Sequence, residues 1–149
     1  MTNPPAKAVP RGIRNNNPGN IDFSKANDWL GQLPFDPAIE SRFARFDSPQ
    51  HGIRALAKTL LSYQRKHGLK TVRAMIGRWA PASENNTTAY ARAVETRLLA
   101  EHGVPPGADI DLQSRALLVC LVQAIIHHEN GANPYTPALV EEGVAKAFG

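Results

Sequence analysis

The chain has 149 residues, with 17 Lys or Arg against 13 Asp or Glu and a formal net charge of +4 at pH 7. That length suits a single domain, and a hydrophobic fraction of 42% is enough for a packed core. Disordered and collagen-like classes are therefore excluded. The modest positive charge favours anionic neighbours such as nucleic acid or cell wall, without choosing between them.

The terminal and apolar segments predict neither secretion nor membrane insertion. The prolines near the N-terminus stand where a secretion signal needs an apolar run, so no signal peptide is expected. The longest apolar stretch, residues 116–126, falls short of the roughly 20 residues that span a bilayer. We expect residues 1–10 to form a flexible arm and residues 11–149 to form one domain. The lone Cys120 cannot form an internal disulfide and is expected to be buried.

Residues 13–46 lack a helical period and are rich in Gly and Pro. The asparagines of RNNNPGNI, residues 14–21, favour a tight turn because Asn tolerates positive φ, although they could equally line a binding cleft. Alternation at residues 43–46 permits a short strand. This part of the chain predicts a small N-terminal lobe of turns and β-structure.

The remainder of the sequence predicts about five helices, each from its apolar spacing and its capping residues. The first expected helix follows Ser48-Pro49 and ends near His67, and the second spans Val72 to Trp79. The third runs from an Asn86 or Thr87 cap to His102-Gly103, and the fourth runs from an Asp111 cap through Leu112 to about Glu129. The fifth starts at Thr136-Pro137. The fold class is therefore mainly α and compact, and with the N-terminal lobe it is lysozyme-like α+β in class.

The segment IIHHENG, residues 125–131, holds the first candidate for a reactive group. An apolar helical stripe through Leu118, Val122 and Ile125 ends at Glu129. Loss of hydration and the negative end of the helix both disfavour a charged carboxylate, as a general acid requires. Alternatively, Glu129 points into water or pairs with a neighbouring histidine.

The segment RWAPASENNTTAY, residues 78–90, places Glu84 beside Trp79, Asn85 and Tyr90. Aromatic rings cover the C–H faces of sugars, and amides bond to their hydroxyl and acetamido groups. The same residues also suit an ordinary helix start, with an acid and an Asn or Thr cap.

Neither a metal nor another cofactor is expected. His127, His128 and Glu129 point about 100° apart on a helix, so they cannot easily share one ion, and no HExxH or paired-Cys motif is present.

The basic residues of the first long helix have two interpretations. Arg54, Lys58, Arg65 and Lys66 lie near Tyr63 and could contact nucleic acid, but such residues more often form a solvated helix face. A nucleic-acid partner is therefore expected to be absent.

Four segments together, residues 11–21, 43–60, 78–90 and 125–131, resemble the small virion structural proteins of tailed bacteriophages and prophages that carry this Asn-rich opening. The resemblance covers about Arg11 to Gly131. Because related domains occur in phage proteins suspected of cutting peptidoglycan, it implies a phage origin and peptidoglycan or other virion proteins as partners. The protein would then act in the periplasm, from the virion or from the host cytoplasm.

The end of IIHHENGANPY is also similar to the helix that carries the catalytic glutamate of lysozyme-like folds and lytic transglycosylases, although here it lies near the C-terminus. This similarity implies Glu129 as the acid, with Glu84 and then Glu40 as further candidates. The residues expected to hold sugars are Asn15, Asn17, Asn20, Trp79, Asn85, Tyr90 and His128. The expected function is a phage muramidase or lytic transglycosylase that cleaves glycan strands. The alternative is a non-catalytic virion structural or glycan-binding protein.

Overall fold

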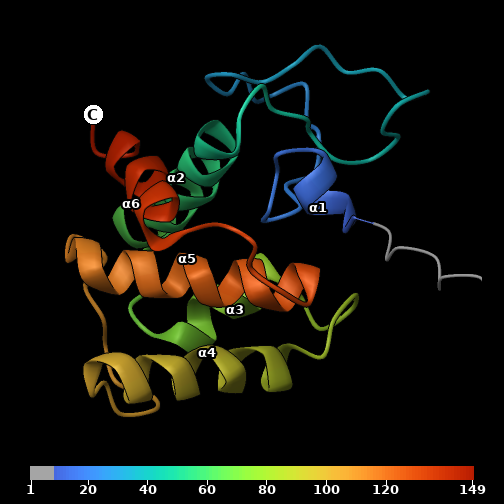
Figure 1. The fold of residues 1–149 in the computed structure, drawn as a ribbon. Helices are drawn as coiled ribbons and strands as arrows, with labels where there is room; N and C mark the ends of the chain where they lie inside the picture. The colour runs from blue at the N-terminus through green and yellow to red at the C-terminus, as the bar shows by residue number, and fades with distance from the viewer. Residues whose placement is uncertain (1–8) are drawn as a thin grey trace, which may run out of the picture.

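The computed structural model describes residues 9–149, and in this range it contains six helices and no strand. The expectation of a compact, mainly α protein is confirmed, whereas most of the expected arm at residues 1–10 lies outside the described residues. No helix within the described range has both the length and the apolar character that a bilayer crossing requires. Along the chain (Figure 1) the helices are α1 (Arg11–Arg14), α2 (Pro49–His67), α3 (Val72–Trp79), α4 (Thr87–His102), α5 (Arg115–Asn130) and α6 (Pro137–Lys146).

The expected caps set the ends of most helices. Ser48 Oγ accepts a hydrogen bond from a backbone N–H in the first turn of α2, and Asn86 does the same at α4. Both helices end at a left-handed glycine, Gly68 with φ 63° and Gly103 with φ 67°. Local sequence signals therefore suffice to locate these elements.

Helix α5 begins later than the sequence predicts, at Arg115 with Ser114 as its cap, so the predicted cap at Asp111 is wrong. The Leu112 N–H donates to Gln64 Oε1 at 2.8 Å, and Gln64 Nε2 donates to the Ile110 carbonyl at 2.7 Å. This pair of bonds ties the segment before α5 to α2 in a non-helical conformation, which delays the start of the helix.

The predicted β-structure of the N-terminal lobe is not seen in the described residues. Isolated bridges join Asp22 to Phe43 and Gln32 to Phe46, but no ladder forms. The reason is that residues 43–46 bond in turn to different segments: Ala44 N–H donates to Ile21, while Leu33 N–H donates to Arg45. The lobe is therefore built of turns, together with the short α1, which the sequence pattern did not predict.

The Asn-rich turn packs directly against α2. Asn16 and Asn20 adopt positive φ values of 52° and 51°, the conformation that asparagine tolerates. At Gly52 the backbone of α2 comes so close to this turn that an added Cβ would lie 1.8 Å from the Asn16 carbonyl oxygen. A glycine on α2 therefore brings the lobe and the helices together.

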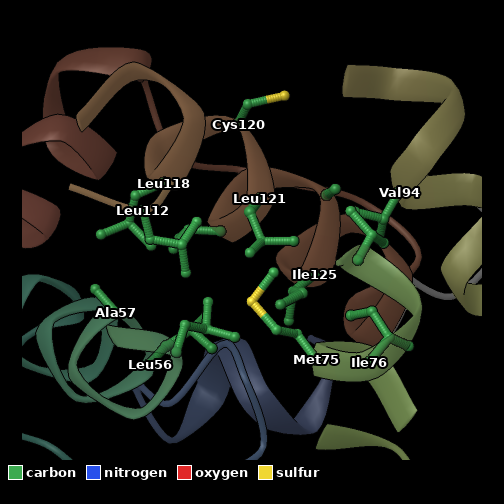
Figure 2. Close-up of a cluster of buried hydrophobic side chains, with 14 of the residues drawn as sticks. Leu56, Ala57, Met75, Ile76, Val94, Leu112, Leu118, Cys120, Leu121 and Ile125 are labelled. Carbon is green, nitrogen blue, oxygen red and sulfur yellow. The ribbon is translucent and has the colours of Figure 1, made fainter. Parts of the chain in front are cut away.

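One apolar core joins the long helices. Figure 2 shows Leu56 of α2, Met75 and Ile76 of α3, Val94 of α4 and Leu121 and Ile125 of α5 converging on one interior, and all six are fully or almost fully buried. Helix α5 contacts α1, α2, α4 and α6. Its position in the core fixes the C-terminal end of the helix, where Glu129 lies.

Candidate active site

A cleft of about 690 Å³ opens between the N-terminal lobe and the helices. Its walls come from residues 19–29 and 42–43 of the lobe, from the face of α2 between residues 58 and 66, and from residues 79–85 after α3, with Glu129 at the end of α5. The cleft is therefore assembled from segments that are far apart in the sequence.

The carboxyl group of Glu129 is held at this cleft by two hydrogen bonds. Its Oε2 accepts from the Tyr90 hydroxyl at 2.9 Å, and its Oε1 accepts from Asn20 Nδ2 at 3.3 Å. The next residue, Asn130, donates to the Pro18 carbonyl at 2.8 Å, which attaches the end of α5 to the Asn-rich turn. Glu129 is half-buried and oriented from both sides rather than loose in solvent.

Tyr90 supports Glu129 from behind. Its ring is fully buried, and burial together with the nearby Glu129 charge raises the pKa of Tyr90 well above its usual value. The hydroxyl therefore stays protonated and donates. His128 stacks on the Tyr90 ring at a centroid distance of 3.6 Å, and neither residue lines the cleft. From the sequence, both residues were expected to hold sugar.

Two further carboxylates line the cleft and share one arginine. Arg42 Nε donates to Asp22 at 2.8 Å and its Nη2 to Glu84 at 3.5 Å, while its guanidinium lies 4.9 Å above the Phe43 ring. Both acidic side chains are exposed. Glu84 is thus in the same cleft as Glu129, and Asp22 is an additional carboxylate that the sequence analysis missed.

Aromatic rings and amides supply the remaining surface suited to sugars. Trp79 and Asn85 line the cleft together with Asn20, as the sequence suggests, and Trp29 joins them from the lobe. This mixture of flat apolar faces and amide groups is typical of carbohydrate-binding surfaces.

Glu40 lies outside the cleft and serves the structure of the lobe. Its carboxylate is 3% exposed and binds Arg11 through two bonds of 2.6 and 2.5 Å, together with the N–H groups of Arg42 and Phe43. The Arg11 guanidinium and these N–H groups hold the pKa of Glu40 well below its usual range, so the group is charged at neutral pH. A proton donor needs an environment that favours the protonated carboxyl group, so Glu40 is not suited to that role.

Asn15 and Asn17 are also buried and do not line the cleft. Asn15 donates to Glu40 at 3.1 Å, and Asn17 donates to the Ile21 and Ala44 carbonyls. Both amides hold the turn itself, so of the two interpretations of the Asn-rich motif, the turn applies to Asn15 and Asn17 and the cleft applies to Asn20.

The α2 face of the cleft includes Lys58, Arg65 and Lys66, basic residues that the sequence singled out without placing them at a cleft. Lys58, Ser62 and Arg65 recur at intervals of four and three, a polar stripe that could have been recognised beside the apolar one. The sequence shows their helical spacing, but only the fold shows that they face the cleft.

Away from the cleft, Glu101, His102 and Cys120 bring possible metal-ligand atoms within 4.8 Å of one another. The Cys120 thiol donates to Glu101 at 3.1 Å, and burial with this carboxylate raises the pKa of Cys120 to about 12. The thiol is therefore protonated at neutral pH and joins α5 to the end of α4.

No family model matches the sequence. The chain is 35% identical over 140 residues to a protein named Protein P5 of Pseudoalteromonas phage PM2, an alignment that covers 93% of this chain and 82% of that protein. The expected relationship to phage proteins is confirmed at this level, and the relative's name specifies no reaction. The chain belongs to the family of Protein P5 of phage PM2.

Proposed function

We propose that this protein is a phage-encoded glycosidase of peptidoglycan, a muramidase or lytic transglycosylase. The observation that supports it most is the half-buried Glu129, held by Tyr90 and Asn20 at the wall of a large cleft. Kinship with a phage protein agrees with a bacterial cell wall as the target. The cleft offers the acid, the aromatic faces and the amides that cleavage of an amino-sugar polymer requires.

In this proposal Glu129 protonates the glycosidic oxygen as the bond breaks. The two carboxyl oxygens have different roles because their partners differ in distance. Tyr90 holds Oε2 at 2.9 Å, while the longer 3.3 Å contact from Asn20 leaves Oε1 as the oxygen that hands over the proton. When substrate enters, the Asn20 amide is free to bond to the sugar.

A second group must stabilise the positive charge that develops on the sugar ring. Glu84 and Asp22 are the cleft carboxylates that can do so, and Arg42 holds them both. The substrate's own acetamido group is the alternative. Asp22→Asn and Glu84→Gln separate these possibilities. Only loss of the carboxylate that stabilises the charge would lower kcat by more than about tenfold, and neither substitution would do so if the acetamido group acts instead.

Glu129→Gln tests the proposal. We expect cleavage of purified peptidoglycan to fall by about 10² to 10⁴-fold, the usual contribution of a general acid, while the fold is retained. Mass spectrometry of the products identifies the reaction: anhydro ends indicate a transglycosylase, and the reducing-end sugar distinguishes a muramidase from a glucosaminidase. Glu141→Gln, on the exposed face of α6, is the matched control.

A non-catalytic glycan-binding virion protein is the second candidate. It is favoured by the fact that both oxygens of Glu129 already accept hydrogen bonds, as in a purely structural carboxylate. Sedimentation with peptidoglycan without any release of soluble fragments would support this candidate, and full activity of the Glu129→Gln variant would remove the role given to Glu129.

A further inference from the structure

The α2 wall of the cleft carries positive charge that the structure does not neutralise. Lys58, Arg65 and Lys66 all line the cleft, and none takes part in a salt bridge or side-chain hydrogen bond among residues 9–149. Arg42, on the lobe side, differs because Asp22 and Glu84 both bind it. The two walls of the cleft are therefore chemically unlike.

Lys58 and Arg65, seven residues apart, share one face of the helix, and Lys66 lies beside this face. Residues 58, 65 and 66 lie within about two turns on α2, over roughly 12 Å of helix axis at 1.5 Å per residue. Arg65 and Lys66 stand in the last turn, where the helix dipole favours cations. Lys58 lies in the middle of α2, where the helix dipole does not stabilise a cation.

We propose that Lys58, Arg65 and Lys66 recognise the free carboxylates of the stem peptides that branch from the glycan strand, so that the substrate is peptide-substituted rather than naked glycan. This inference rests on the proposed function. The uncharged sugars contact the rings and amides around Trp79 and Asn85, and the branching peptides lie along α2. Because cation–carboxylate pairs at a surface are individually weak, the three act together.

The test measures binding rather than cleavage, so that it can be separated from the proposed function. Glu129→Gln protein is titrated with solubilised glycan strands, either carrying stem peptides or stripped of them by an amidase. We expect peptide-bearing strands to bind about tenfold more tightly, from three modest ion pairs. Added Lys58→Gln, Arg65→Gln and Lys66→Gln substitutions should abolish this preference, while binding of stripped strands is unchanged.

The control removes the same charge elsewhere: Lys70→Gln, Arg92→Gln and Lys146→Gln lie outside the cleft and should keep the preference. Equal binding of both strand types, or a preference that survives the α2 substitutions, would overturn the inference. Competition by duplex DNA as strong as that by peptide-bearing strands would also overturn it in favour of a nucleic-acid surface. If the preference is found and the wild type cleaves nothing, the inference stands and the proposed glycosidase fails.

Discussion

Glu129 and Tyr90 form a hydrogen-bonded pair in which, under the proposed function, Glu129 reacts and Tyr90 fixes its position. The tyrosine contributes a protonated hydroxyl from inside the core, and its ring is held by the stack with His128. Without this bond, a carboxyl group at a helix end would sample several rotamers and would be aligned with the glycosidic oxygen for less of the time. The precision of the site depends on a residue that never touches the cleft.

Tyr90→Phe should therefore reduce turnover without loosening the fold. The ring and its packing remain, and only the bond to Glu129 is lost. Since a hydrogen bond to a charged group contributes about 1.5–3 kcal/mol, we expect kcat on peptidoglycan to fall by about 10-fold or more with little change in KM.

Tyr135→Phe is the matched control, because the buried hydroxyl of this half-buried residue has no partner among residues 9–149 and lies outside the cleft. It should leave kcat unchanged. An equal loss in both variants, or a loss confined to KM, would show that Tyr90 does not position the acid.

For single residues, the sequence predicts the position of a side chain where helical periodicity determines it. The stripe through Leu118, Val122 and Ile125 correctly placed Glu129 at the edge of the core. It could not reveal that Glu40 is paired with Arg11, because those residues are 29 apart and no local pattern links them.

Helix α2 holds the whole arrangement together, since one side of it packs in the core and another lines the cleft. Its contact with the Asn-rich turn at Gly52 leaves no room for a side chain, because an added Cβ would meet both the carbonyl carbon and oxygen of Asn16. The neighbouring atoms are backbone and cannot rotate away.

Gly52→Ala should accordingly destabilise the protein by about 1–3 kcal/mol, as overpacking of a close contact does. Gly77→Ala on α3 is the control, because its Cβ would meet nothing within 4 Å and alanine favours the helix by about 0.5–1 kcal/mol. Chemical denaturation of the two variants measures both effects. A stable Gly52→Ala protein would mean that the turn and α2 are less closely packed than the structure shows.

Element boundaries were predictable where a side chain caps its own helix and not where a distant group intervenes. Ser48, Asn86 and the glycines that follow α2 and α4 act within one turn. The start of α5 depends on Gln64, 48 residues before Leu112, and the missing sheet depends on the different segments to which residues 44 and 45 bond. In both cases, hydrogen bonds between residues far apart in the sequence override the local pattern that predicts a helix cap or a strand.

Across the whole molecule, the ion pair between the exposed Arg11 and the buried Glu40 makes stability depend on pH. The pKa of Glu40 is lowered in the folded state, first by Arg11, so its charged form stabilises the fold above its ordinary pKa of 4.5. Below about pH 4.5 the unfolded chain takes up a proton at Glu40 while the folded protein resists it, so that contribution shrinks as the pH falls toward the lower pKa of the folded state.

Thermal unfolding of wild type and Glu40→Gln protein from pH 7 to pH 3 tests this dependence. We expect the wild type to be the more stable at pH 7 and its advantage to shrink below about pH 4.5. Glu141→Gln, an exposed substitution, should show no such convergence. An advantage that is constant over this range would mean that the charge on Glu40 is not what stabilises the lobe.

The bonds that join the end of α5 to the Asn-rich turn connect residues 109 and 112 positions apart, Asn20 with Glu129 and Pro18 with Asn130. During synthesis the lobe and α2 are therefore made long before the acid that completes the cleft. The contacts between the end of α5 and the Asn-rich turn can form only after residue 130 has emerged from the ribosome. The wall of the cleft around Glu129 can therefore be completed only when nearly the whole chain has been made.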